Sequence, residues 1–168
     1  MRISDRIAFG GQAAVSLGLL AGALIIGDVF RVMPCYLCNF QRFLYMLLIF
    51  FGLCGVLLPR LRRAWALFSA LTALGGVAAA AQQSWMQYAP QESIECGFSD
   101  PTPVERFVDW LGGLWPSMFM VTGLCKDKDW TILGLTLANW SALAFLALAA
   151  IALWLLFRRE EKRGWWAR

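Results

Sequence analysis

Cysteine is the residue type through which this chain could carry out chemistry. Its 168 residues include five cysteines but no histidine, so the usual general base and the commonest metal ligand are both absent. Cys35 and Cys38 form a Cys-X-X-Cys unit, which favours thiol–disulfide exchange because one thiol in such a unit readily becomes the reactive thiolate. Cys96 and Cys125 are left as a second pair by elimination, although spacing alone does not establish that they bond to each other.

The neighbours of the Cys-X-X-Cys unit support a redox role. Pro34 precedes the pair and an apolar run begins shortly after it, which predicts that both sulfurs lie near the positive N-terminal end of a helix. Arg42 follows Cys38 by four residues, so on a helix its guanidinium would lie on the same face, one turn deeper, and stabilise a thiolate. The alternative for Arg42 is that its side chain only reaches the lipid headgroups.

Two other interpretations of the cysteines stay open. Four of them could bind one zinc ion, but structural zinc sites usually combine two Cys-X-X-Cys units, and Cys96 and Cys125 stand singly. Alternatively, they could form disulfides that only hold loops together. Cys54, which lies between Gly52 and Gly55, is expected to serve helix packing. We therefore predict no metal site.

The elements that must hold these cysteines are membrane-spanning helices. The chain is 60% hydrophobic and only 15% charged, which is typical of a protein embedded in lipid. A bilayer requires roughly 20 apolar residues of helix, and the chain has four charge-free stretches near that length. They lie at about 7–27, 43–58, 64–88 and 135–157. We therefore predict an all-α membrane protein in which residues 1–168 form one antiparallel bundle of four transmembrane helices.

The basic residues predict how the bundle is oriented. Most of the 15 Lys and Arg residues lie in the two termini and in the turn after Pro59, and such segments stay in the cytoplasm. This pattern indicates membrane topology rather than nucleic-acid binding, and it favours a retained first helix over a cleaved signal peptide. Both termini are thus expected in the cytoplasm. The segments at about 28–42 and 89–134, with every cysteine except Cys54, are expected in the periplasm, where disulfides can form.

The long outer segment at about 89–134 contains a predicted helix of its own. Loops of this length are generally functional or disordered, and this one is too rich in Trp, Phe and Val for disorder. Apolar residues recur in it at helical spacing, namely Val104, Phe107, Val108, Leu111 and Trp115. We predict a short helix lying on the membrane surface; packing only against neighbouring loop residues is the alternative.

The cysteine motifs and their surroundings resemble the DsbB family of quinone-linked disulfide bond formation proteins along nearly the whole chain. Three segments carry the resemblance, together with the four predicted spans. They are Met33-Pro34-Cys35-Tyr36-Leu37-Cys38 with Gln41-Arg42 following, Cys96 in a long outer loop, and Gly123-Leu124-Cys125 leading through Trp130 to Leu133-Gly134-Leu135.

The resemblance implies a thiol oxidase of the bacterial inner membrane that takes electrons from a reduced DsbA-like protein, a periplasmic partner with a thioredoxin fold. The electrons would pass to Cys96 and Cys125, then to Cys35 and Cys38, and finally to ubiquinone or menaquinone. Cys96 would bond transiently to the partner, Cys125 would attack Cys35, and Cys38 would face the quinone. Arg42 would lie beside the quinone and stabilise the charged pair.

The end of the third span departs from the family pattern. Many relatives have an Arg-His pair there, whereas this chain has Gln82 and Gln83. Gln83 can donate a hydrogen bond to a quinone carbonyl but cannot carry charge. We predict that Gln83 contacts the quinone; an ordinary polar helix end is the alternative.

Two rival functions remain at this point. A vitamin-K-epoxide-reductase-like enzyme also joins a Cys-X-X-Cys unit, a loop cysteine pair and a quinone on a helix bundle. That family, however, places its loop pair early in the chain and its Cys-X-X-Cys unit late, the reverse of the order found here. The other rival is a non-enzymatic membrane protein whose cysteines form structural disulfides.

Overall fold

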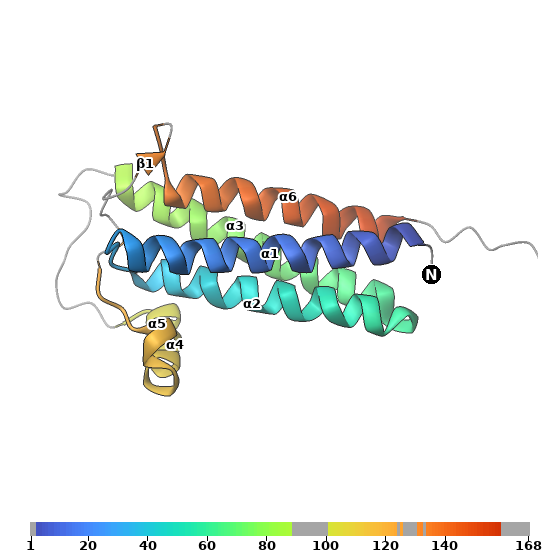
Figure 1. The fold of residues 1–168 in the computed structure, drawn as a ribbon, viewed down its shortest axis with the longest axis horizontal. Coiled ribbons are helices and arrows are strands. Elements are labelled where there is room, and N and C mark those ends of the chain that lie inside the picture. Colours follow the sequence, from blue (N-terminus) through green and yellow to red (C-terminus); the bar gives the residue numbers. More distant parts are fainter. Residues whose placement is uncertain (1–2, 89–100, 124, 126–130, 133, 159–168) are drawn as a thin grey trace, which may run out of the picture.

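Four long helices form the body of the protein (Figure 1). The computed structural model describes residues 3–88, 101–123, 125, 131–132 and 134–158. The four helices are α1 (Ile3–Val29), α2 (Tyr36–Leu57), α3 (Arg62–Tyr88) and α6 (Leu137–Phe157). Each is long and apolar enough to cross a membrane. The predicted all-α membrane bundle is confirmed.

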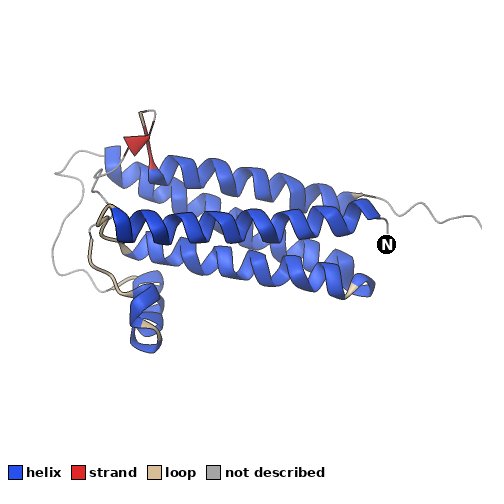
Figure 2. Cartoon of the chain, viewed as in Figure 1, coloured by secondary structure: helices blue, strands red, loops and turns tan. Residues whose placement is uncertain are grey.

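Short elements connect the long helices (Figure 2). The turn between α2 and α3 contains the 3-10 helix η1 (Pro59–Leu61). The segment before α6 contains α4 (Pro103–Leu114), α5 (Pro116–Phe119), and two strands, β1 (Thr131–Ile132) and β2 (Leu135–Thr136). The strands pair antiparallel as Thr131 with Thr136 and Ile132 with Leu135. Thr136 then caps α6, where its side chain accepts a hydrogen bond from the Asn139 amide.

Three of the helices extend beyond the charge-free stretches in the sequence. Helix α2 begins at Tyr36 instead of near residue 43, so it includes Cys38 and Arg42. Helix α1 includes Asp5 and α3 begins at Arg62. Arg42, Asp5 and Arg62 lie within these helices because each has hydrogen-bond partners on another element, which a search for charge-free stretches does not reveal.

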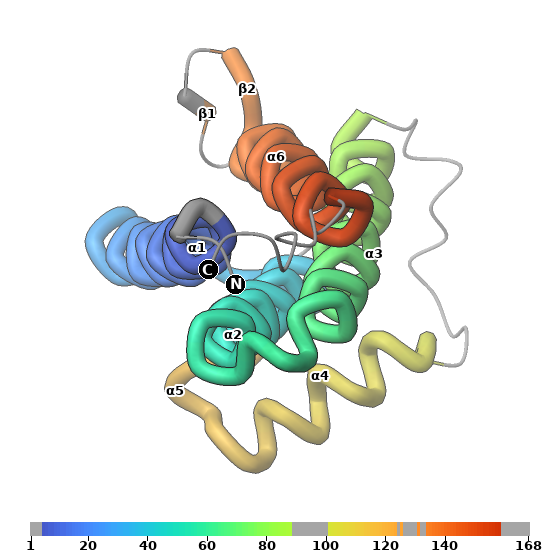
Figure 3. The backbone as a smooth tube through the Cα atoms, turned by 90° about the vertical axis from the view of Figure 1, so that its right-hand side faces the viewer, coloured from blue at the N-terminus to red at the C-terminus, as the bar shows by residue number. Residues whose placement is uncertain are grey.

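The bundle is held by α1 packed on α2, α2 on α3, and α3 on α6, whereas α1 and α6 make few contacts (Figure 3). Its central cluster includes Leu48, Ala73, Phe145 and Leu148. Helices α3 and α6 can approach closely because Gly76 has no side chain. A Cβ atom at this position would collide with the Phe145 ring. The Phe145 ring in turn stacks on the Tyr45 ring, with centroids 4.3 Å apart, and thereby fixes the Tyr45 side chain.

Helix α4 lies against the side of α2 near the end where α2 begins (Figures 1 and 3), and Cys35 and Cys38 are at that same end. Thr102 and Glu105 form a capping box at its start. The Phe107 ring packs edge-on against the rings of Phe40 and Phe43 on α2, with centroids 6.4 and 5.1 Å away. The predicted short helix is therefore confirmed, and its packing extends to the bundle. Its contact with the membrane surface stays a prediction.

Candidate active site

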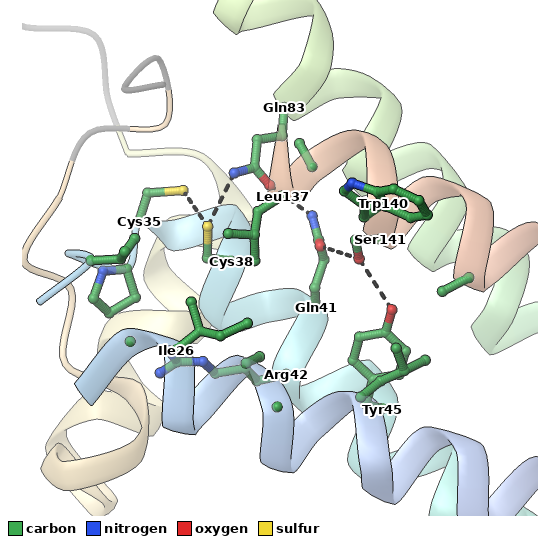
Figure 4. Close-up of a pocket in the computed structure, with 18 of the residues that line it drawn as sticks. Ile26, Cys35, Cys38, Gln41, Arg42, Tyr45, Gln83, Leu137, Trp140 and Ser141 are labelled. Atoms are coloured by element: carbon green, nitrogen blue, oxygen red, sulfur yellow. Dashed lines mark hydrogen bonds between the residues drawn. The ribbon is translucent and has the colours of Figure 1, made fainter. Parts of the chain in front are cut away.

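Cys35 and Cys38 lie at the N-terminus of α2. Cys35 is the N-cap residue, with extended backbone, and Cys38 lies in the first turn. The Cys35 thiol donates a hydrogen bond to Cys38 Sγ over 3.2 Å (Figure 4). Both cysteines line a cavity, but the Cys35 side chain is buried among apolar neighbours whereas Cys38 is partly exposed. The predicted position of the pair at a helix start is what the structure shows.

Cys125 reaches this pair because the chain before it is tied to the segment before α2. The amides of Thr122 and Gly123 both donate to the Pro34 carbonyl, over 3.0 and 3.2 Å. A side chain at Gly123 would collide with the Met33 carbonyl, so only glycine permits this approach. Cys125 packs in the same cluster as Cys35, and the structure holds Cys35, Cys38 and Cys125 as free thiols.

Cys35 and Cys125 have opposite pKa shifts. Hydrogen bonding of the Cys35 thiol to Cys125 and to Cys38, together with burial, raises the pKa of Cys35. The hydrogen bond from the Cys35 thiol lowers the pKa of Cys125. A hydrogen bond from the Leu37 backbone lowers it further, whereas burial raises it. Of these two sulfurs, Cys125 is therefore the one that more readily becomes a thiolate.

Two polar residues of α2 hold the loop that leads to Cys125. Asn39 is fully buried, and its Nδ2 donates to the carbonyls of Phe119 and Met120 over 2.8 and 3.2 Å. Arg42 Nη1 donates to Asn39 Oδ1 over 3.2 Å and to the Met118 carbonyl over 3.0 Å. Arg42 therefore binds the Met118 carbonyl near the end of α5, where a cation is favourable.

Gln83 of α3 contacts Cys38 directly. Its Nε2 donates to Cys38 Sγ over 3.0 Å, and its Oε1 accepts from Gln41 Nε2 over 2.8 Å. Gln41 in turn accepts from the Ser141 hydroxyl of α6, which is also bonded to the Tyr45 hydroxyl (Figure 4). The buried Gln83 amide thus bonds directly to the Cys38 sulfur.

A cavity of about 550 Å³ lies beside Cys38. Small and apolar residues of α1 and α6 form about half of its wall, among them Gly18, Gly22, Ile26, Leu137 and Ala144. Its polar side is formed by Cys38, Gln41, Arg42, Gln83 and Ser141. A cavity of this size, mostly apolar with a few convergent polar groups, is typical of a small-molecule or cofactor site.

The structure brings together five of the six residues that the sequence singled out as site residues, namely Cys35, Cys38, Arg42, Gln83 and Cys125. The sixth, Cys96, lies outside the described residues. Sequence reasoning missed the contributions of Asn39, Gln41, Tyr45 and Ser141. Their signal was present, because a polar residue in a helix otherwise apolar needs a buried partner.

Removing the Cys35 thiol should make Cys125 less reactive toward alkylation. In the reduced protein, the lowered pKa of Cys125 predicts that its alkylation persists below the ordinary thiol range and is lost only as pH falls through that lowered pKa. Cys35→Ala removes the donor and should shift this loss to higher pH, whereas Cys35→Ser keeps a hydroxyl donor and should preserve the profile. Site-resolved mass spectrometry measures both profiles. Identical curves for the two variants would contradict a hydrogen bond from the Cys35 thiol to Cys125.

Comparison with known proteins yields one consistent family. The family model described as disulfide bond formation protein DsbB matches residues 5–155. Disulfide bond formation protein B of Dechloromonas aromatica (strain RCB) is 47% identical, over 87% of this chain and 88% of its own. The proteins of the same name from Azoarcus sp. (strain BH72) and Nitrosospira multiformis are 41% and 38% identical, again over 87% or more of each chain.

Proposed function

Because the chain belongs to the DsbB family, it is a membrane protein of disulfide bond formation, and we propose that it reoxidises a DsbA-like periplasmic protein and passes the electrons to a membrane quinone. One observation carries the proposal: Cys125 lies beside Cys35, Cys35 beside Cys38, and Cys38 at a cavity. The family match also favours this function over a vitamin-K-epoxide-reductase-like enzyme.

The first half of the exchange converts a disulfide between Cys96 and Cys125 into one that involves Cys35. A partner thiolate attacks Cys96, forms a mixed disulfide and releases Cys125 as a thiolate. Cys125 then attacks Cys35 in the Cys35–Cys38 disulfide, so that a Cys125–Cys35 bond forms and Cys38 leaves as a thiolate. The Cys35 thiol, which lowers the pKa of Cys125 most in the reduced protein, has no proton to donate in the Cys35–Cys38 disulfide. At this step it is the Leu37 backbone, which also lowers the pKa of Cys125, that supports Cys125 as nucleophile.

The second half restores the loop pair. The partner's second thiolate attacks the mixed disulfide, forms the partner's own disulfide and releases Cys96 as a thiolate. Cys96 then attacks Cys125, which re-forms the Cys96–Cys125 bond and releases Cys35, and Cys35 takes up a proton. The raised pKa of Cys35 fits this fate. The net result is an oxidised partner and a reduced Cys35/Cys38 pair.

The residues around the cavity fit a quinone. A quinone head is a flat apolar ring with two acceptor oxygens, and the wall offers apolar faces together with N–H donors from Arg42 and Gln83. When bound, ubiquinone or menaquinone accepts two electrons and two protons from a dithiol. Of the two cysteines that line the cavity, Cys38 is the more exposed, which supports it as the sulfur that reacts there. Arg42, held by Asn39 and Met118, would stabilise negative charge on Cys38.

The arrangement of the helices supports the proposed topology. Helix α1 begins and α6 ends at one end of the bundle, and the cysteine site lies at the other (Figure 1). The basic termini would then lie in the cytoplasm and the cysteines in the periplasm, on the outer face of the bacterial inner membrane. The whole chain would act as one membrane domain surrounded by lipid.

The test of this function is a reconstituted reaction. The purified protein is mixed with a reduced DsbA-like protein and with ubiquinone or menaquinone, and quinone reduction is followed by absorbance. We expect one quinone to be reduced for each partner disulfide formed. If neither quinone is reduced with any of several reduced partners, the proposal is wrong, and structural disulfides become the better interpretation of the cysteines.

Filling the cavity from α1 should weaken quinone use without affecting the thiols. A side chain added at Gly22 meets open space in the cavity wall, so Gly22→Leu would occupy room that the quinone needs. We expect the quinone KM to rise on the order of tenfold, equivalent to about 1.4 kcal/mol of binding. Gly11→Leu is the matched control, because Gly11 also has open space but does not line the cavity. Equal effects of the two variants would argue against a quinone at this cavity.

A further inference from the structure

A continuous hydrogen-bonded chain runs from Tyr45 through three helices to Cys38 (Figure 4). Tyr45 and Ser141 are joined over 3.1 Å, and Ser141 and Gln41 over 2.6 Å. The amides of Gln41 and Gln83 are joined over 2.8 Å, and Gln83 reaches Cys38 over 3.0 Å. The cysteine exchange does not require this chain of neutral groups, so its presence needs another explanation.

Each hydrogen bond in this chain is donated in the direction of the Cys38 sulfur. The single Ser141 hydrogen is donated to Gln41 Oε1, so the Tyr45 hydroxyl must donate to Ser141. Gln41 Nε2 then donates to Gln83 Oε1, and Gln83 Nε2 donates to Cys38. Hydrogen bonds aligned in one direction polarise one another, so the donor at the end is strengthened. A chain that ends in an N–H aimed at sulfur suits a thiolate.

The reverse arrangement would suit the opposite charge state. If both amides were flipped, Gln83 would present Oε1 to Cys38 and could only accept from a protonated thiol. Gln41 opposes a turn of the Gln83 amide alone, because its own Oε1 accepts from Ser141 and its Nε2 faces Gln83 Oε1. Both amides and both hydroxyls would have to turn together, and the reversed chain would then face the Arg42 charge with a neutral thiol instead of a thiolate. Gln41, Gln83 and Tyr45 are all buried, so bulk water does not compete for these bonds.

We propose that Gln41 is a positioning residue that holds the Gln83 amide with Nε2 toward Cys38 and so stabilises the Cys38 thiolate. The inference deepens the proposed function, since it rests on Cys38 reacting as a thiolate. Charged or titratable neighbours of Cys38 are Cys35, Cys125 and Arg42. Arg42 stabilises the thiolate by charge, and the amide chain adds directional hydrogen bonding that charge alone does not supply.

The test measures the thiolate directly, without quinone. The reduced, quinone-free protein is treated with a small alkylating reagent, and the rate at Cys38 is followed by site-resolved mass spectrometry over a range of pH. Loss of a hydrogen bond to the charged sulfur predicts that Gln83→Met and Gln41→Met each slow alkylation at near-neutral pH about tenfold. Methionine keeps the length of glutamine, and circular dichroism shows whether each variant folds.

Gln12→Met is the matched control. Gln12 is equally buried, and its Nε2 donates to Ser69 Oγ over 2.9 Å, but it does not line the cavity or contact a cysteine. This variant loses a buried amide like the others and should alkylate at the wild-type rate. If it slows Cys38 as much as Gln41→Met does, the effect is general loosening of the bundle and the proposal is wrong.

Combining variants distinguishes positioning from structure. Gln41 acts through Gln83, so Gln41→Met should have no further effect in the Gln83→Met background. Gln41→Glu supplies a carboxylate that draws the Gln83 N–H away from Cys38, so this near-isosteric change should slow alkylation at least as much as methionine. Additive single effects, or a wild-type rate in Gln41→Glu, would overturn the proposal. Because quinone is absent, these outcomes are separate from failure of the turnover assay.

Discussion

Replacing Cys38 with serine should abolish quinone reduction. Cys38 is the more exposed of the two cysteines that line the cavity, and its sulfur accepts hydrogen bonds from both Cys35 and Gln83. A serine hydroxyl keeps a polar atom of similar size in place but can neither form a disulfide with Cys35 nor pass electrons onward. The rate should fall to that of a mixture without the protein, measured by quinone absorbance with a reduced DsbA-like donor.

Cys54→Ser provides the comparison for this loss. Cys54 is also a free thiol on α2, but it does not line the cavity. Its replacement should leave turnover close to that of the wild type. Sustained quinone reduction by the Cys38→Ser variant would remove Cys38 from the electron path. A comparable loss in Cys54→Ser would show that the assay responds to any cysteine lost from α2.

The sequence predicted those parts of the site that depend on local patterns. The Cys-X-X-Cys unit, Pro34 and the following apolar run lie within a few residues of one another, so their arrangement at a helix start follows from helix geometry. The number of long helices was equally accessible, because each apolar run is itself the signal. Helix α4 was found from its own periodicity, and its capping box is seen only in the structure.

The parts that depend on contacts between distant segments were not accessible in the same way. Cys125 reaches Cys35 only because the Thr122 and Gly123 amides bind the Pro34 carbonyl. Gln41 and Ser141 meet although they are 100 residues apart in the chain. Which faces of two helices meet, and at what height, depends on the packing of the whole bundle, which no local pattern encodes. The polar residues could be noticed in the sequence, but their partners could not.

The charged residues at the helix ends show the same limit. Asp5 and Arg62 lie just outside the charge-free stretches, where the sequence indicates a topology role for the basic residues, Arg62 among them, and none for Asp5. In the structure Arg62 Nη1 donates to Asp5 Oδ2 over 3.0 Å, and both side chains are buried. Arg158, at the end of α6, donates to Asp5 Oδ1 over 3.3 Å. Asp5 therefore joins the starts of α1 and α3 to the end of α6, at the end of the bundle opposite the cysteines.

Asp5→Ala should be strongly destabilising. This substitution removes the Asp5 carboxylate that pairs with the buried Arg62 guanidinium. Removing one partner of a buried ion pair costs about 3–5 kcal/mol. Asp5→Asn keeps one oxygen acceptor without the charge and should cost less. The free energy of unfolding, measured by circular dichroism in mixed detergent micelles, tests both variants.

Asp28→Ala separates this effect from the general cost of removing an aspartate from α1. Asp28 lies near the other end of the same helix and is exposed. Its loss should change stability by no more than about 0.5 kcal/mol. Below the unfolding range, Asp5→Ala should still reduce quinone at nearly the wild-type rate, because Asp5 and the cysteines lie at opposite ends of the bundle. If Asp5→Ala were as stable as Asp28→Ala, the three-helix ion cluster would contribute nothing to holding the bundle closed at that end.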